Sequence, residues 1–414
     1  MADADVIIVG GGAAGLTAAI FAAEARPQAR VVVVDGAKVL GAKILVSGGG
    51  RCNVTHRQVA AVDFNGSRNI VRNVLAAFDE TATVRWFESM GVHLVQEPTG
   101  KLFPVANSAR AVVTALLERC AALGVELKTA TRVTAVTAGK NAFTVRTDAS
   151  ALLAPAVVLA TGGRSLPRSG SDGFGWELAR SLGHTVTPTH AALVPLSLDP
   201  TLFHADLAGI AQDVELIVVV NGKRVDRRTG SMLWTHFGVS GPVVMDASRH
   251  WTTAHESGQR PTLLCNLTPG RTFEQVDADW VAATAARPRS TLLTHLSARV
   301  PERVAMALLR HVGLAPEGVA GQLSRDGRRT LVHALTALVL PVSQQRGWNY
   351  AEVTAGGVPL GEIDYRTMQS RRVPGLYFAG EILDCDGRIG GFNFQWAWTT
   401  GYLAGRAAAS RKSP

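Results

Sequence analysis

The hydrophobic positions of this chain gather in short apolar runs that end in glycine. Val6–Val9 is followed at once by GGGAAG at positions 10–15 and then by an apolar segment that reaches Ala25. Short apolar runs bounded by turn residues are typical of buried parallel strands. The first run therefore predicts a strand, a glycine turn and a helix, and Val31–Val34 predicts the neighbouring parallel strand.

The same pattern returns twice later in the chain, while the middle differs. Ala156–Leu159 and Leu376–Phe378 are apolar runs that each end near glycines. Between them, residues 191–270 contain alternating strand-like segments, and residues 271–344 have helical spacing. The pattern predicts an α/β domain built from residues 1–190 and 345–414, interrupted by an antiparallel, barrel-like domain at 191–270 and a helical subdomain at 271–344.

The first glycine turn has the spacing of a dinucleotide-binding fingerprint. Gly10 permits a tight turn, Gly12 lets the backbone approach a pyrophosphate, and Gly15 lets helix and strand pack closely. Asp35 ends the second strand, twenty positions after Gly15, where a carboxylate accepts hydrogen bonds from ribose hydroxyls. Strand, turn, helix, strand and acidic residue follow in the required order, so we expect a bound dinucleotide without a 2′-phosphate.

A second glycine-rich segment, residues 41–55, contains three consecutive glycines followed by Arg51 and Asn53. We interpret it as a loop whose main chain lies against a planar ligand, with Lys43 and Arg51 as cationic donors. A flexible surface hairpin is the alternative, although a hairpin does not require these polar residues around its glycines.

Composition narrows the class of protein. The 414 residues, 47% of them hydrophobic and 18% charged, indicate a folded protein of two or three domains. No apolar run approaches the roughly 20 residues of a membrane span, and no basic segment precedes the first strand, so we expect a cytoplasmic protein without a signal peptide. The four cysteines are isolated from one another, which fits a reducing compartment and predicts no metal site.

The net charge of +9 favours an anionic ligand and admits a nucleic-acid partner. The basic residues are scattered, and no interleaved aromatic and basic motif typical of RNA-binding modules is present. We therefore expect a small-molecule substrate, no membrane and no nucleic acid, and we keep an RNA-associated flavoprotein as an alternative. The expected assembly is a monomer or a homodimer.

Four segments of the chain resemble the BaiN-like family of FAD-dependent oxidoreductases. They are GAKILVSGGGRCNVTH, WTHFGVSGP, AEVTAGGVPLGEID and PGLYFAGEILDCDGRIGGFNFQWAW. The family includes proteins described as aminoacetone oxidase and bile-acid enone reductase. The resemblance implies an α/β fold, with a discontinuous Rossmann-like FAD-binding domain around a β-barrel-like and helical insertion.

The resemblance also implies a set of FAD-binding residues. They are Gly10, Gly12, Ala13, Ala14 and Gly15 at the pyrophosphate; Asp35 at the ribose; Lys43, Ser47, Gly49, Arg51, Cys52 and Asn53 toward the flavin; Val133 at the adenine; Thr161 and Gly162 at the pyrophosphate; Gly380, Glu381 and Asp384 at the ribityl chain; and Gly391, Asn393 and Phe394 at the isoalloxazine. A helix that begins near Gly391 would direct N–H groups at the flavin and stabilise its reduced, anionic form.

The reaction is less constrained than the cofactor. We expect reduction of an activated C=C bond with NAD(P)H as a transient donor, because the chain has one complete dinucleotide fingerprint. An oxidase of small amines or aminoketones is the alternative. His236 and Arg51 are the catalytic candidates, and a hydrogen-bonded structural histidine is the alternative for His236. Cys52 and Cys385 both lie in flavin-contacting motifs, so a redox disulfide between them is a further hypothesis.

Overall fold

A seven-stranded sheet lies at the centre of the first unit of the computed structural model, which describes residues 2–411. This unit comprises the described residues up to Thr189 and from Val353 onward. The strand order is β21-β22-β23-β11-β1-β2-β7, and the five strands from β23 to β7 are parallel. Their bounds are β1 Val6–Val9, β2 Val31–Val34, β7 Glu126–Lys128, β11 Ala156–Leu159, β21 Ile363–Asp364, β22 Gln369–Ser370 and β23 Leu376–Phe378. The predicted α/β fold with a parallel sheet is confirmed.

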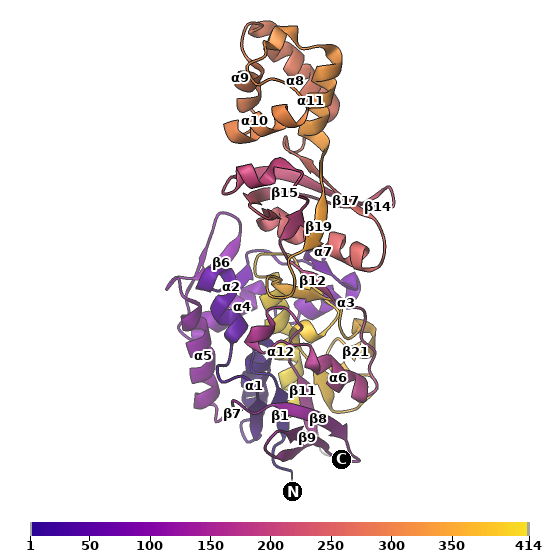
Figure 1. Ribbon diagram of the computed structural model, residues 1–414. Helices are drawn as coiled ribbons and strands as arrows, with labels where there is room; N and C mark the ends of the chain where they lie inside the picture. Colours follow the sequence, from indigo (N-terminus) through magenta and orange to yellow (C-terminus); the bar gives the residue numbers. More distant parts are fainter. Residues whose placement is uncertain (1, 412–414) are drawn as a thin grey trace. The chain divides into compact units, whose positions relative to one another are not determined.

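Two helices from opposite ends of the sequence pack against each other beside this sheet (Figure 1). They are α1, Ala13–Ala25, and α12, Phe392–Ala409. Gly401 faces Ala14 and Thr17, and Gly405 faces Ala18, so the two helices run in the same direction. Because α1 is covered by the sheet and by α12, its apolar residues can occupy every face of the helix.

The remaining elements of this unit extend the sheet and its edges. Its other helices are α2 Ala42–Gly50, α3 Arg68–Leu75, α4 Glu80–Ser89, α5 Ala109–Ala122 and α6 Phe174–Ser181. Its other strands are β3 Thr55–His56, β4 Phe64–Asn65, β5 Leu94–Gln96, β6 Lys101–Pro104, β8 Val133–Ala138, β9 Phe143–Thr147, β10 Ala151–Ala154, β20 Val353–Ala355 and β24 Asp386–Gly387. The segment expected as a loop at 41–55 begins as helix α2, which Ser47, Gly48 and Gly49 interrupt with non-helical backbone angles.

The second unit, His190–Glu352, is built on an antiparallel sheet of order β18-β17-β14-β15-β16-β13-β19. The strands are β13 Leu196–Leu198, β14 Ala211–Val220, β15 Lys223–Thr235, β16 Gly238–Ser240, β17 Pro261–Asn266, β18 Leu338–Leu340 and β19 Val342–Gln345, and β12 spans His190–Ala192. β18 and β19 stand at the two ends of this order, so within the described residues the sheet is open and not closed as a barrel.

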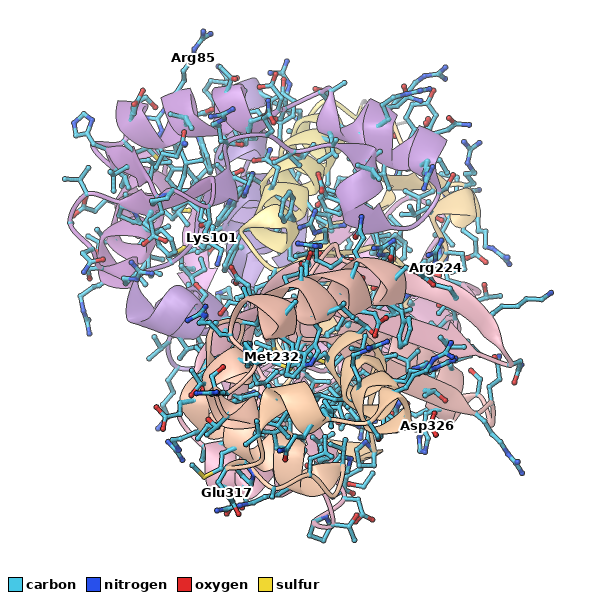
Figure 2. The ribbon with its side chains drawn as sticks, turned by 90° about the horizontal axis from the view of Figure 1, so that it is seen from above. Arg85, Lys101, Arg224, Met232, Glu317 and Asp326 are labelled. Carbon is cyan, nitrogen blue, oxygen red and sulfur yellow. The ribbon has the colours of Figure 1, made fainter. Side chains whose placement is uncertain are left out.

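Five helices belong to the second unit: α7 Pro242–Glu256, α8 Phe273–Ala286, α9 Leu292–Ser297, α10 Glu302–His311 and α11 Arg325–Ala337. Helices α8 to α11 share one hydrophobic cluster with the sheet. Helix α7 packs on β14, β15 and β17 and was not expected. Arg224, labelled in Figure 2, follows the turn between β14 and β15 and is exposed. Between residues 2 and 411, no helix combines the length and apolar character needed to cross a membrane.

A half-buried ionic cluster joins β15 to α7 within the second unit. Arg228 Nε donates to Asp226 Oδ2 at 2.7 Å, and His250 Nε2 lies 3.6 Å from Asp226 Oδ1. Burial lowers the pKa of His250 to about 4, against the attraction of Asp226. The histidine is therefore neutral in the folded protein at pH 7.

We expect the second unit to lose stability as the pH falls from about 6.5 to about 4. The unfolded chain binds a proton on His250 below pH ~6.5 while the folded chain does not, so acid favours unfolding, by about 3 kcal/mol at most. Urea unfolding of His250→Gln at several pH values should show a shallower dependence than the wild type. His255→Gln, on the exposed end of the same helix, is the control; an unchanged slope in His250→Gln would contradict the prediction.

Candidate functional site

The glycines of the first turn each have a distinct steric role. A Cβ on Gly10 would lie 2.4 Å from Ala160 O, and one on Gly15 would lie 1.8 Å from Gly10 O. A Cβ on Gly12 would meet nothing within 4 Å. Gly12 is also the residue before α1, and no side chain caps the helix there. Gly10 and Gly15 thus permit close packing, while Gly12 leaves the positive end of α1 open to an anion.

Asp35 is fixed beside this turn by the backbone. Its Oδ2 accepts from Gly11 N at 2.6 Å, and its Oδ1 accepts from Ala37 N at 2.7 Å. Each oxygen retains a second lone pair for a ligand hydroxyl. The chain that leads to Val133 passes close by, because Thr131 N donates to Asp35 O at 2.9 Å. Val133 itself is buried at the start of β8.

A second uncapped helix start lies at the same edge of the sheet. Gly391, with φ +92°, precedes α12, and no side chain caps the helix. Since α12 runs parallel to α1 and the contacts of Gly401 and Gly405 fix their register, α12 begins about two turns before α1, or about 10 Å. The positive N-terminal ends of α1 and α12 therefore face the same region, at two different heights along the helix axes.

Glu381 connects three separate segments of the first unit. Lys43 Nζ lies 2.5 Å from Glu381 Oε2 and 2.7 Å from Ser165 Oγ. Glu381 Oε1 accepts from Thr354 N at 2.8 Å and from Ser165 Oγ at 3.0 Å. We call these four residues the Glu381 cluster. Lys43 and Glu381 had been expected to contact the cofactor, and in this structure they hold each other.

The segment after α2 turns sharply on left-handed glycines. Gly48 and Gly49 have φ of +56° and +70°, and a Cβ on Gly49 would meet nothing within 4 Å. The buried Asn53 Oδ1 has no hydrogen-bond partner in the part of the chain that the structure describes. An unpaired buried acceptor is costly, so it indicates a ligand or water donor at this point. The Cys52 backbone N–H donates to the Ser47 carbonyl within this turn. Burial raises the pKa of the Cys52 thiol to about 12.

Several expected cofactor ligands have side chains that are engaged elsewhere. Asn393 bonds both ways to the Gly387 backbone, donating at 2.9 Å and accepting at 2.8 Å. Asp384 Oδ2 accepts from Thr187 Oγ1 at 3.1 Å. The Asn393 amide therefore positions the backbone of β24 at Gly387, whereas the Asp384 carboxylate is tied to Thr187. Phe394 stacks on Trp398 with ring centroids 5.5 Å apart.

The remaining expected residues line the ends of the parallel strands. Thr161 and Gly162 directly follow β11, and the buried Thr161 Oγ1 has no hydrogen-bond partner among the described residues. Gly380 has φ +79°, and a Cβ there would lie 2.8 Å from Ala14 Cβ. Ala13 and Ala14 are the first residues of α1. The ends of β1, β11 and β23 thus come together with the start of α1.

The two catalytic candidates lie in different units. Arg51 forms an ion pair with Glu97 at 2.7 Å and stacks on Phe103 at 4.0 Å in the first unit. His236 is exposed on the turn between β15 and β16 of the second unit, and its ring meets Phe237 edge-on. Arg51 is therefore already paired, and among the described residues no partner that would activate His236 is found.

The disulfide hypothesis is not supported. All four cysteines of the chain are buried thiols, and none is joined to another. Burial also raises the pKa of Cys120 to about 12, so this thiol is protonated at neutral pH. Among residues 2–411, no three His, Cys, Asp or Glu side chains are arranged to hold a metal ion.

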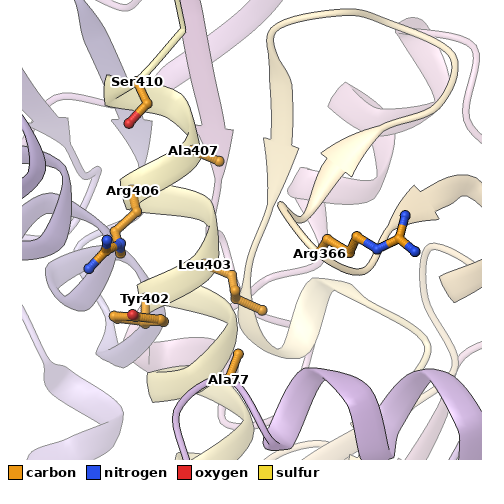
Figure 3. Close-up of a pocket in the computed structure, with 7 residues that line it drawn as sticks. All are labelled: Ala77, Arg366, Tyr402, Leu403, Arg406, Ala407 and Ser410. Atoms are coloured by element: carbon orange, nitrogen blue, oxygen red, sulfur yellow. The ribbon is translucent and has the colours of Figure 1, made fainter.

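A pocket of about 330 Å³ lies at the opposite end of α12 from Gly391 (Figure 3). Its lining includes Tyr402, Leu403, Arg406 and Ala407 on the last turns of α12, with Arg366 on the turn between β21 and β22. Along α12, Tyr402 to Ala407 lie about 15–25 Å from Gly391. The pocket is therefore separate from the expected flavin end of the cofactor site.

Comparison with known proteins assigns the chain to a family. The model of the HI0933-like protein Rossmann domain matches residues 4–407. The chain belongs to the HI0933-like family. It is 34% identical to a 3-dehydro-bile acid delta(4,6)-reductase of Clostridium scindens, over 98% of each chain. It is 33% identical to a ribosomal RNA dihydrouridine synthase of Escherichia coli, over 99% of each chain.

A solved structure agrees in fold. A 3-ketosteroid delta1-dehydrogenase of Sterolibacterium denitrificans superimposes with a TM-score of 0.52 at 15% identity, covering 99% of this chain and 100% of that one. The family assignment confirms the resemblance noted from the motifs and the prediction of an FAD-dependent oxidoreductase. The individual residue roles stay predictions.

The first unit of this HI0933-like protein has structural features that fit a bound FAD. Gly12 and Gly49 leave open space, Asn53 Oδ1 needs a donor, and two uncapped helix starts lie about 10 Å apart along their axes. One helix end suits a diphosphate and the other suits the electron-rich edge of a flavin.

Sequence reasoning missed residues that support this site. His56 stacks on Phe392, the first residue of α12, with centroids 4.9 Å apart, and its Nε2 lies 3.0 Å from Thr99 O. Gln395 Oε1 accepts from Thr55 Oγ1 at 2.6 Å, and Gln395 Nε2 donates to Phe78 O at 2.9 Å. His56 ends the motif GGGRCNVTH and Gln395 lies in GGFNFQWAW, so the motifs contained the signal. Their roles emerge only when the two segments meet.

Proposed function

We propose that this protein uses NAD(P)H to reduce a C=C bond conjugated to a carbonyl, with FAD as its resident cofactor. The observation that carries the proposal is the pair of full-length relatives at 34% and 33% identity. The names of both describe saturation of such a bond, in a steroid dienone and in the uracil ring. Overall, the substrate, NAD(P)H and one proton give the saturated carbonyl compound and NAD(P)⁺.

FAD would supply the redox chemistry, accepting two electrons from NAD(P)H and passing them to the substrate. The residues of this chain bind and orient it. The N-terminus of α1, opened by Gly12, would bind the diphosphate, and Asp35 would accept ribose hydroxyls. The N-terminus of α12 would stabilise negative charge on the pyrimidine side of the ring. Asn53 Oδ1 would accept one N–H of the ligand.

The Glu381 cluster would keep this site rigid. Glu381 links Lys43 of α2 to Thr354 of β20 and to Ser165, so three segments that border the site move together. Its carboxylate accepts hydrogen bonds from all three of these residues. His56 would hold Phe392 in place by stacking, because both of its ring nitrogens already face backbone groups.

A uracil ring within RNA is the second candidate substrate, and the charge of the chain favours it. The net charge is +9, and Lys223, Arg224 and Arg227 are exposed at the start of β15. Such residues lower the free energy of binding to phosphates in a salt-dependent way. The uracil C5=C6 bond is conjugated to a carbonyl, so the chemistry would be the same.

Anaerobic stopped-flow reduction tests the electron donor. We expect NADH or NADPH to bleach the flavin band near ~450 nm within seconds, whereas a panel of small amines should leave it unchanged. Fast bleaching by an amine with none by either nicotinamide would instead assign the protein as an amine oxidase. A folded protein without any such band, after reconstitution with FAD, would overturn the flavin assignment.

A further inference from the structure

The side chain of Arg346 lies between two aromatic rings within the second unit. Its guanidinium carbon is 4.0 Å from the centroid of Phe237 and 3.9 Å from that of Tyr350. Phe237 lies on the turn between β15 and β16, beside His236, while Arg346 directly follows β19. We call Phe237, Arg346 and Tyr350 the arginine clamp. It joins two segments that are more than 100 positions apart in sequence.

The guanidinium of Arg346 has no hydrogen bond and no ion pair with any residue between 2 and 411. Other arginines of this unit are paired: Arg227 with Glu215 and Arg228 with Asp226, both at 2.7 Å. Glu256 contacts Gln345, the residue before Arg346, at 3.3 Å, but its carboxylate pairs with His190 at 2.6 Å and not with Arg346. Arg346 is therefore held in position with its N–H donors available.

The geometry of the clamp limits what Arg346 can bind. Both faces of the guanidinium are covered by rings, so a ligand can reach only the edge, where the N–H donors form a planar fork. That fork matches two oxygens of a carboxylate or a phosphate. Stacking also restricts the rotamers of the arginine in advance, so less conformational entropy is lost on binding.

We propose that the arginine clamp is a binding site of the second unit for an oxyanion group, a carboxylate or a phosphate, of a ligand that also carries an apolar or planar part. Tyr350 is 49% exposed and offers its outer face to an apolar or planar part of the same molecule. The exposed His236, edge-on to Phe237, lies beside the clamp.

Equilibrium binding to the oxidised, FAD-loaded protein tests the clamp without turnover. Two probes distinguish the source of the oxyanion: cholate, a carboxylate on a steroid, and hexauridylate, a phosphodiester chain. For at least one probe, we expect Arg346→Gln to raise Kd by about 10- to 100-fold, the loss of a charge-assisted fork. Arg346→Lys should lose most of this affinity as well, since a lysine keeps the charge but not the planar fork.

Arg366→Gln is the matched control, because this exposed arginine stacks on a single tyrosine, Tyr365, at 5.3 Å in the other unit. It should leave both Kd values unchanged. The rate of flavin reduction by NAD(P)H should be equal in all variants, so a failure of the proposed function would show in that rate and not in the Kd. Absence of binding of both probes to the wild type, an unchanged Kd in Arg346→Gln, or full affinity in Arg346→Lys would overturn the clamp.

Discussion

Gly12→Val is expected to give a folded protein that purifies without FAD. Gly12 has φ −85° and ψ −166°, a conformation that valine adopts readily, and a Cβ there meets no atom of the protein within 4 Å. The new side chain would occupy the space in front of the α1 N-terminus, where the diphosphate is expected. Loss of several N–H contacts to an anion should weaken FAD binding by ~100-fold or more, about 3 kcal/mol.

The matched control is Gly361→Val in the short 3-10 helix Leu360–Glu362. A Cβ on Gly361 also meets nothing within 4 Å, and this residue is exposed. FAD titration, followed by flavin fluorescence, should give a wild-type Kd for the control and a greatly raised Kd for Gly12→Val. Circular dichroism should show that both are folded. An unchanged Kd in Gly12→Val would place the diphosphate elsewhere.

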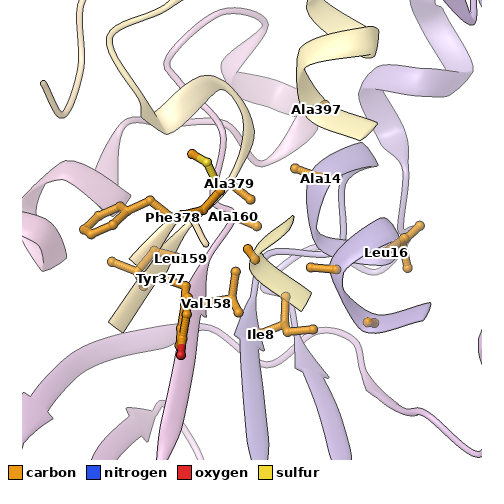
Figure 4. Packing of buried hydrophobic residues seen from close by; sticks show 14 of the residues in the cluster. Ile8, Ala14, Leu16, Val158, Leu159, Ala160, Tyr377, Phe378, Ala379 and Ala397 are labelled. Atoms are coloured by element: carbon orange, nitrogen blue, oxygen red, sulfur yellow. The ribbon is translucent and has the colours of Figure 1, made fainter. Parts of the chain in front are cut away.

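Gly405→Ala should destabilise the first unit by about 3 kcal/mol, because α1 and α12 leave no room for a methyl group. A Cβ on Gly405 would lie 2.2 Å from Ala18 O, a backbone atom that cannot move without displacing α1. Figure 4 shows Ala14 of α1 beside Ala397 of α12 in the same helix pair. Separating the helices would also move their N-termini apart, so FAD affinity should fall together with stability.

Urea unfolding of the protein with and without added FAD measures both effects. Arg406→Ala is the control, since Arg406 is the exposed neighbour of Gly405 on α12 and should change stability by no more than ~0.5 kcal/mol. Wild-type stability in Gly405→Ala would mean that the close approach of the two helices contributes little.

The sequence was most informative where one local signal decided the structure. The short apolar runs predicted β1, β2 and β11, because a buried parallel strand requires apolar residues on both faces. The spacing of Gly10, Gly12 and Gly15 predicted the strand, turn and helix, since each glycine answers a separate steric demand.

Local signals were insufficient where one segment meets another. Helix α7 was missed although Pro242 follows Gly241 and apolar residues recur at helical spacing from Val243 to Ala254. The segment of helix α2 was expected to be a loop because its three glycines favour a turn, although the apolar residues Ile44 to Val46 precede them. Ser108 directly precedes α5 and is a residue type that favours the N-cap, yet its side chain makes no cap hydrogen bond.

The candidate site shows the same division. The fingerprint glycines and Asp35 could be placed from sequence, because their roles depend on residues within one βαβ unit. The Glu381 cluster could not, because Lys43 and Glu381 are 338 positions apart and meet only after the sheet has formed. Asn393 was assigned to the ligand from its motif, whereas its amide hydrogen-bonds the Gly387 backbone.

The oxidative half-reaction tests the central claim most directly. The flavin would be reduced photochemically without oxygen and then mixed with a 4-ene-3-ketosteroid or with hexauridylate. We predict that one of these substrates restores the absorbance near ~450 nm and gains two hydrogens, seen as a product heavier by ~2 Da. A band that stays bleached with both substrates and returns only with oxygen would contradict the assignment as a reductase of conjugated C=C bonds.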